Sequence, residues 1–303
     1  MILLAIPAVA LTLVTVAAFF GRWSWLLDVA ANFRVQYTAI LALTAVFLLL
    51  ARWWKTGSIV LVGALINAAV VAPLYFGGPP ADAPTEASLR ILSFNLRARN
   101  ENFGEVINYI RRENPDIAFL HEASRPWEMA IEGADLDYEV TKSRSQELIF
   151  GTLVLSRPGD PVTSYGFTTG GARAVEVIHD GVAVLGIHPL APTTAERSAL
   201  RNAQIQFAEE WSREQSGPHV VTGDFNATPW SYPFRRLLAR TDLVNSQKGF
   251  GVSATFPASG NFLLRIPIDH LVHTPDLVVV DRRLGPSLGS DHFPLVVDLA
   301  EAG

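Results

Sequence analysis

The hydrophobic pattern divides the chain into an apolar N-terminal part and a more polar remainder. Residues 1–76 hold only five charged side chains and contain three apolar stretches, at 2–20, 36–51 and 58–76. A helix that crosses the hydrocarbon layer needs about 20 mostly apolar residues, with about 17 as the lower limit. The first and third stretches meet this length, and the second does so if Arg52 extends its side chain to the interface. We therefore predict about three transmembrane helices.

A cleaved signal peptide and a buried core helix are the alternatives for the first stretch. Signal peptides begin with a positive region and end at small residues, whereas residues 1–5 carry no charged side chain and residues 19–22 read Phe-Phe-Gly-Arg. Three such stretches in 76 residues also speak against a water-soluble core. Arg52 and Lys55, in the short second loop, slightly favour a cytoplasmic N-terminus and an extracytoplasmic C-terminal part.

The polar remainder begins with a spacer. Residues 77–86 are rich in Gly, Pro and Ala and lack a hydrophobic period, as is typical of a partly stiff linker. From residue 77 onward there are 20 basic and 28 acidic side chains, a net charge near −8 that speaks against a broad basic surface for nucleic acid. The chain has no cysteine, which excludes disulfides and thiolate sites. We expect one water-soluble domain at 87–303.

Short apolar runs alternate with helical periods along this domain. We predict strands at 89–94, 116–120, 148–155, 174–178, 182–187, 219–221, 266–273, 277–282 and 294–299, and helices at 102–112, 194–214 and 231–239. Strands outnumber helices, and the helices are interspersed among them. The pattern is typical of a mixed α/β fold with sheets packed in layers.

Polar side chains with catalytic chemistry recur where the predicted strands end or begin. They are Asn95, Glu122, His188, Asp224, Asn226, Asp269, Asp291 and His292. Each has a plain structural explanation when taken alone, such as a turn residue or a helix cap. Their repeated position favours a shared site instead, because strand ends meet at one rim of a sheet.

The order and context of these residues resemble the endonuclease/exonuclease/phosphatase family, which includes DNase I-like nucleases, neutral sphingomyelinases and inositol-phosphate phosphatases. The matching stretches are Ser93-Phe94-Asn95, residues 114–122, residues 151–157, His188, residues 223–229, Ile268-Asp269-His270 and Ser290-Asp291-His292. The resemblance covers residues 89–299, and the membrane segments ahead of it are similar to a bacterial subgroup. It implies a four-layer α/β/β/α sandwich, here in a multi-pass protein of the bacterial inner membrane.

The resemblance also implies a role for each residue. Asn95, Glu122 and Asp291 would form or adjoin a site for Mg²⁺ or Mn²⁺, which prefer hard oxygen ligands. Asp224 would deprotonate the attacking water, and Asn226 would donate to a phosphoryl oxygen. The remaining roles concern imidazoles: His292 would contact phosphate while Asp269 holds its charge, and His188 would stabilise phosphate or assist the leaving group. A cation, imidazolium groups and a carboxylate base are what hydrolysis of an anionic phosphate ester requires.

The chain departs from the family pattern at two positions that could change the substrate rim, and five further residues are lesser candidates for a role at the site. The family commonly has an aromatic residue where this chain has His270, and leucine where it has Pro189. Arg173 and Arg201 are candidates for phosphate contacts, although an ion pair with the helix near Thr194 is the simpler expectation for Arg201. Arg157 is expected to end a strand. Trp230 and Phe256 are candidates for rim or packing positions.

These inferences lead us to expect a membrane-anchored Mg²⁺-dependent hydrolase of phosphate esters. Its partners would be the lipid bilayer and a substrate drawn from phospholipid head groups, small phosphate esters or nucleic acid, and no protein partner is implied. A tethered nuclease is the main alternative. An inactive scaffold is disfavoured because the catalytic set is complete, and a transporter because the three stretches hold no buried charge, with Asn67 their main polar group.

Overall fold

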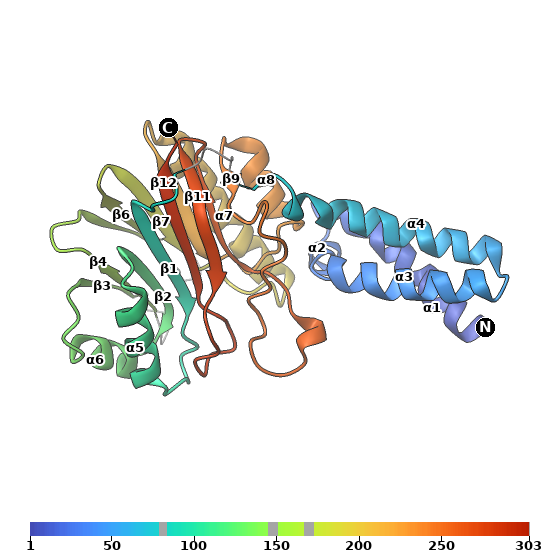
Figure 1. Ribbon diagram of the computed structural model, residues 1–303, viewed down its shortest axis with the longest axis horizontal. Helices are drawn as coiled ribbons and strands as arrows, with labels where there is room; N and C mark the ends of the chain where they lie inside the picture. The colour runs from blue at the N-terminus through green and yellow to red at the C-terminus, as the bar shows by residue number, and fades with distance from the viewer. Residues whose placement is uncertain (79–83, 145–150, 167–172, 303) are drawn as a thin grey trace.

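The computed structural model describes residues 1–78, 84–144, 151–166 and 173–302. A helical bundle built from the first 75 residues extends from one side of an α/β domain (Figure 1). The expected strand at 148–155 begins outside the described residues and is seen from Gly151 onward. Residues 79–83 of the linker expected at 77–86 also lie outside them.

The domain contains two six-stranded sheets. The first has the order β11-β12-β1-β2-β4-β3, and the second the order β5-β6-β7-β8-β10-β9. The strands are β1 Leu89–Asn95, β2 Ile117–Ala123, β3 Glu139–Arg144, β4 Gly151–Ser156, β5 Val162–Gly166, β6 Arg173–His179, β7 Val182–Ile187, β8 His219–Asp224, β9 Val244–Asn245, β10 Asp269–His273, β11 Leu277–Leu284 and β12 Leu295–Glu301. The helices are α5 Phe103–Glu113, α6 Arg125–Glu132, α7 Ala195–Glu214 and α8 Tyr232–Arg240, with a short 3-10 turn, η3, at Phe262–Leu264.

Three buried clusters define four layers. One lies between the sheets and includes Phe119 and Val184. A second joins the outer face of the first sheet to α5 and α6, and a third joins the second sheet to α7 and α8. The sheets approach so closely that a Cβ on Gly186 would lie 2.1 Å from Cδ1 of Phe119. The expected α/β/β/α sandwich is confirmed.

Strand direction decides where the polar strand ends meet. β1 and β2 run parallel, as do β7 and β8, so each pair ends at the same rim of its sheet. β12 and β10 run antiparallel to these strands, so their amino ends reach that rim too. The sandwich therefore gathers residues from six strand ends into one place.

The N-terminal part forms helices α1 Ile2–Ala17, α2 Trp25–Ala31, α3 Arg34–Leu50 and α4 Trp54–Val71, with 3-10 turns η1 Ala18–Phe20 and η2 Ala72–Tyr75. Two continuous helical segments, Ile2–Phe20 and Trp54–Tyr75, are long and apolar enough to cross a membrane. The expected second span is instead a pair, α2 and α3, bent by 66°. Two clear candidates are thus present where about three were predicted, and the bent pair would supply the third.

Arg34 is a buried charge at the start of α3, two residues before the apolar stretch predicted at 36–51. Its side chain is fully buried, and its Nη1 donates to the carbonyl oxygen of Thr15 and to Oδ1 of Asn67, both at 2.9 Å. Asn67 in turn donates to Oγ1 of Thr15 at 2.8 Å. The cation is tolerated because carbonyl oxygens near the C-terminal end of α1 carry partial negative charge. Arg34 therefore joins three helices at the domain-facing end of the bundle.

The bundle is docked against the domain rather than merely tethered to it. Nη2 of Arg201, in α7, lies 2.6 Å from Oδ2 of Asp28, in α2, and both side chains are buried. Oδ1 of Asp28 accepts from the backbone N–H of Tyr232, also at 2.6 Å. Trp230 packs in a cluster with Ala31 and other residues of the helices. These contacts fix the bundle to the rim side of the second sheet.

Candidate active site

The polar strand ends line one cavity of about 370 Å³. Seven of the eight predicted site residues are on its wall: Asn95, Glu122, His188, Asp224, Asn226, Asp291 and His292. Asp269, the eighth, lies behind His292. The sandwich therefore brings the whole predicted set to one location.

Asn95 connects the two carboxylates that face the cavity from different sheets. Its Nδ2 donates to Oε1 of Glu122 at 3.2 Å and to Oδ2 of Asp224 at 3.1 Å. Its Oδ1 accepts from the backbone N–H of Arg97 at 3.0 Å. In this orientation Asn95 positions the acids through its nitrogen, and its Oδ1 has a second lone pair with which it could bind a cation beside the contact with Arg97.

The backbone is strained at Glu122 and on both sides of Asp224. Glu122 and Asn226 have φ of 53° and 47°, a left-handed conformation that costs non-glycine residues energy and clusters at functional sites. Gly223, before Asp224, has φ of 137°, and a Cβ there would lie 1.9 Å from the carbonyl oxygen of Ile187. Only glycine fits this turn, which directs the Asp224 side chain into the cavity.

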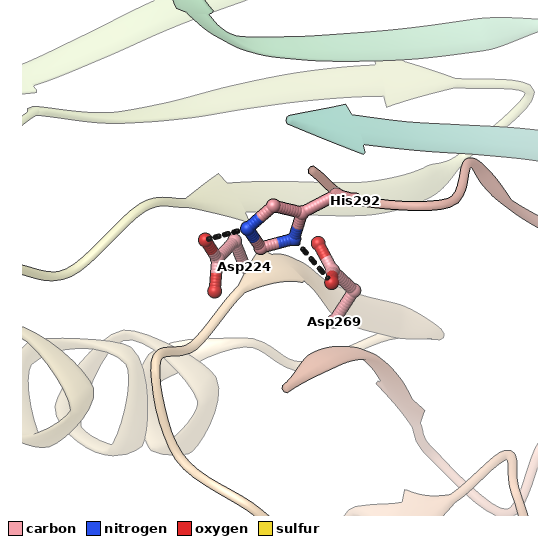
Figure 2. A group of neighbouring side chains, drawn as sticks. All are labelled: Asp224, Asp269 and His292. Atoms are coloured by element: carbon pink, nitrogen blue, oxygen red, sulfur yellow. Dashed lines mark hydrogen bonds and ion pairs between the residues drawn. The ribbon is translucent and has the colours of Figure 1, made fainter. Parts of the chain in front are cut away.

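Asp269, His292 and Asp224 form a chain of charges (Figure 2). Nδ1 of His292 donates to Oδ2 of Asp269 at 2.8 Å, and its Nε2 lies 3.7 Å from Oδ2 of Asp224. Burial alone lowers the pKa of His292, but the Asp269 and Asp224 carboxylates outweigh it and raise this pKa to about 10. His292 is therefore an imidazolium at neutral pH.

Asp224 has the surroundings of a base. The side chain is buried, and this burial, followed by the charge of Asp269, raises the pKa of Asp224 above its ordinary value. Oδ1 accepts from the backbone N–H of Asn226 at 2.9 Å, which fixes the carboxylate plane. A carboxylate with a raised pKa is a better proton acceptor than an exposed one.

Two groups of side chains at the site are candidates for binding a cation. Asp224, Asp269 and His292 offer ligand atoms within 4.8 Å of one another. A protonated His292 has no lone pair for a metal, however, so this group is better described as an ion-pair relay. Glu122 and Asp291 are partly exposed carboxylates on the same cavity wall, with Nε of Arg97 3.7 Å from Oδ2 of Asp291. Their hard oxygens suit Mg²⁺ or Mn²⁺.

Two histidines from different sheets face each other at the inner end of the site. Nε2 of His188 lies 3.6 Å from Oδ2 of Asp224 and 3.9 Å from Oε1 of Glu122. Its ring is 5.2 Å from that of His121, whose Nδ1 is 3.1 Å from Oγ1 of Thr152. Burial lowers the pKa of His121 well below its ordinary value, so the ring is neutral. His121 is not among the eight residues predicted from the sequence, although it directly precedes Glu122.

Asn32 is the lining residue that the sequence gave least reason to expect. It follows α2, in the N-terminal part, yet it lines the cavity beside Asn226. Its Oδ1 accepts from Oγ1 of Thr228 at 3.1 Å and from Oγ of Ser231 at 2.8 Å. The sequence around Asn32 does not indicate this contact, because Thr228 and Ser231 are about two hundred residues away in the chain.

The lesser candidates separate clearly. Arg201 does not contact the cavity; it pairs with Asp28 and donates to the carbonyl oxygen of Asn226 at 3.1 Å, which replaces the expected pair within its own helix. Phe256 lines the cavity, with its ring 4.9 Å from that of His292. Arg157 pairs with Asp116 at the end of β4, as expected of a structural residue. The side chain of Arg173 lies outside the described residues.

The two departures from the family pattern have different consequences. His270 is buried behind the cavity, 4.5 Å from the ring of Phe234, and its Nε2 donates to the carbonyl oxygen of Ala227 at 2.8 Å. Burial lowers the pKa of His270 to about 4, so it packs as a neutral ring. Pro189 lines the cavity, and its carbonyl oxygen accepts from Nδ2 of Asn226 at 3.0 Å. Only Pro189 thus shapes the rim.

Solved structures with this architecture come from several organisms. A D. rerio TDP2 in complex with a single-strand DNA product is similar with a TM-score of 0.59 at 15% identity, over 70% of this chain and 98% of that one. The catalytic domain of human Nocturnin with bound sulfate gives 0.55 at 19% identity, over 71% and 94%. A Bacteroides thetaiotaomicron mannosyl-6-phosphatase gives 0.53 at 16% identity, over 70% and 100%. At these identities the likeness shows a shared fold.

The sequence was also compared with curated proteins and with family profiles. No curated protein matches the chain. The sequence profile of one family matches residues 92–292, more than half of the chain, a range that spans the site from Asn95 to His292. This agrees with the motifs at the strand ends and with the sandwich fold. The chain therefore belongs to the Endonuclease/Exonuclease/phosphatase family of metal-dependent phosphoric ester hydrolases.

Proposed function

We propose that this protein is a membrane-anchored, Mg²⁺- or Mn²⁺-dependent hydrolase of phosphate esters. The observation that carries the proposal is the shared cavity: Glu122, Asp224 and His292 come from both sheets and face the same space. Asn95 links Glu122 to Asp224, and His292 stands 3.7 Å from Asp224. An acid for a cation, a buried base and an imidazolium are thus present within reach of one phosphate.

Glu122 and Asp291, with Asn95 beside them, would hold the cation, which supplies charge neutralisation at the phosphoryl oxygens when bound. Imidazolium His292 would donate to a second phosphoryl oxygen, because Asp269 keeps its proton in place. Nδ2 of Asn226 donates to the carbonyl oxygen of Pro189 at 3.0 Å and to Oδ2 of Asp224 at 3.4 Å, and it would exchange the longer of these contacts for one to a phosphoryl oxygen. These groups stabilise the charge that builds up during attack.

Asp224 would act as the general base. It takes one proton from a water molecule, the water oxygen forms a bond to phosphorus, and the ester P–O bond on the opposite side breaks. The leaving oxygen then receives a proton, for which His188 at the cavity wall is the candidate donor. General acid–base help of this kind contributes about 10²–10⁴-fold to the rate.

The membrane anchor would consist of the two long apolar helices and the bent pair. Large apolar side chains such as Leu3, Leu43 and Leu50 point outward from the bundle and are exposed. A helix that is apolar on all sides is stable in lipid but not in water. Multi-pass insertion in a bacterial inner membrane, with the domain on the extracytoplasmic side, remains our proposal for its location.

The test is turnover of a soluble activated phosphodiester by the purified full-length protein in detergent. We expect hydrolysis with Mg²⁺ or Mn²⁺, loss of activity with EDTA, and a fall of at least about 10²-fold in Glu122→Gln and in Asp224→Asn. Equal turnover by these variants and wild type would overturn the proposal. Metal-dependent nicking of supercoiled plasmid, with no turnover of small or lipid phosphate esters, would instead favour the tethered nuclease.

A further inference from the structure

The first observation is that the cavity is not built by the α/β domain alone. Asn32, between α2 and α3, forms part of its wall and is fixed there by hydrogen bonds from Thr228 and Ser231. Arg201 adds a second link, since it bridges Asp28 of α2 to the backbone of Asn226. The wall of the cavity is therefore built by the bundle and the domain together.

The second observation concerns the character of the cavity walls. The predicted catalytic residues supply charged groups to the lining. The rest of the lining is mostly apolar, with residues 189–192, Phe256, Ile266 and Ile268, and Arg197 adds a cation. A site with a charged base and apolar walls fits an amphipathic ligand, with a phosphate inside and hydrocarbon toward the opening.

The third observation is an exposed apolar triplet shortly before the lining residue Ile266 in the chain. Phe262, Leu263 and Leu264, in η3, are 67%, 60% and 53% exposed. Their loop, coloured orange, projects beside the domain-facing end of the bundle in Figure 1 and leads directly to the wall residue Ile266. Consecutive exposed apolar residues on an acidic domain are costly in water and mark an interaction surface.

A hydrogen bond fixes the position of this loop along the length of the bundle. Nε2 of Gln36 donates to the carbonyl oxygen of Arg265 at 2.8 Å. Gln36 lies in the first turn of α3, immediately before the apolar residues that continue to Leu50. The loop is thus held at the height where the apolar part of α3 begins, which is the boundary between water and hydrocarbon if the bundle spans a bilayer.

We propose that Phe262, Leu263 and Leu264 insert into the bilayer surface and that the cavity takes its phosphate ester from a membrane phospholipid. This inference rests on the proposed hydrolase function and adds the substrate class and the route of entry. The head group leaves the bilayer along the wall formed by Asn32, while the acyl chains stay in the membrane. The reaction is the hydrolysis described above, at one ester bond of the head group.

The absence of cysteine allows a direct test of insertion. Leu263→Cys, labelled with an environment-sensitive fluorophore in lipid nanodiscs, should show a blue-shifted emission that is quenched by lipids spin-labelled near the top of the acyl chain. The matched control is Met129→Cys, in α6 on the outer face of the first sheet, where the native side chain is 65% exposed against 60% for Leu263. Quenching at position 263 no stronger than at position 129 would overturn the insertion, whatever the enzyme's activity.

The substrate class is tested separately with the variant F262S/L263S/L264S. Burial of one large apolar side chain in the membrane contributes at least about tenfold to the affinity for the bilayer. We therefore expect the triple variant to hydrolyse phospholipid in vesicles at least about tenfold more slowly than wild type. Hydrolysis of the soluble phosphodiester should stay at the wild-type rate, as it should for Met129→Ser on both substrates. Equal loss on both substrates, or wild-type turnover of vesicle lipid, would refute the proposal. Absence of metal-dependent turnover of the soluble ester would instead refute the underlying function.

Discussion

The buried ion pair between Arg201 and Asp28 offers the sharpest test of the contact between bundle and active site. Arg201→Met leaves the Asp28 carboxylate buried with only the Tyr232 N–H as a hydrogen-bond donor among the described residues. Removing one partner of a buried pair costs about 3–5 kcal/mol. For a chain of this size that corresponds to a fall of roughly 6–20 °C in the midpoint of thermal unfolding. Asp28→Asn should cost less, because its amide oxygen still accepts a hydrogen bond.

Arg201→Met should also lower the catalytic rate. Arg201 donates to the carbonyl oxygen of Asn226, which itself contacts Asp224. A displacement of about 1 Å at such a position can cost about 100-fold in rate. We therefore expect a lower kcat in Arg201→Met, measured at a temperature where the variant is still folded, with a smaller change in KM.

The assay combines thermal unfolding in detergent with turnover of the soluble phosphodiester, for both single variants and the double variant. The double variant should be more stable than the sum of the single effects predicts, by about 0.5–3 kcal/mol, because the two groups are in contact. Lys142→Met breaks an exposed pair with Glu132 and serves as the control, with a cost of at most about 1 kcal/mol. If Arg201→Met behaved like Lys142→Met, or if the effects of the two single variants added, the coupling would be refuted.

Three further predictions concern the site. Asp269→Asn should lower the pKa of His292 from about 10, seen in NMR titration of the ring, and reduce kcat by about 10²-fold or more; an unchanged titration would contradict the relay. The pKa of His270 is about 4 in the folded state and about 6.5 in the unfolded chain. Its contribution to the free energy of unfolding is therefore fully present above pH 6.5 and is lost as the pH falls toward 4, by on the order of 3 kcal/mol. His270→Phe should remove that part of the pH dependence of the unfolding midpoint while losing the hydrogen bond to Ala227, and an unaltered slope would refute this. Gly223→Ala should unfold at a lower temperature and lose activity, since a Cβ has no space there; a variant as stable and active as wild type would disprove the steric argument.

The rim of the sandwich could be predicted from sequence because strand ends are local features. Asn95, Glu122 and Asp224 each follow a short apolar run, and parallel pairing of β1 with β2 and of β7 with β8 brings such ends together. The family motifs supplied what periodicity cannot, namely which strands pair and in which sheet.

What could not be predicted depends on contacts between distant segments. Asp28 and Arg201 are 173 residues apart, and nothing near either residue indicates its partner. Arg34 was expected in a loop, whereas carbonyl and amide oxygens of other helices accept its hydrogen bonds. The helical pattern also gave no sign of the bend after α2, where the Asn32 side chain is used to bind Thr228 and Ser231.

The central claim is that one cation site at Glu122 serves the cavity while the neighbouring Asp269 and His292 act as a charge relay. Mn²⁺ binding, followed by electron paramagnetic resonance in the full-length protein, tests it most directly. We predict that Glu122→Gln weakens Mn²⁺ binding by more than about tenfold, because an anionic oxygen ligand is lost. Asp269→Asn should bind Mn²⁺ within about a few-fold of wild type, because the Asp269 side chain contacts His292 and not the proposed ligands. Wild-type affinity in Glu122→Gln, together with loss of binding in Asp269→Asn, would show that the cation lies in the other cluster and would contradict the account.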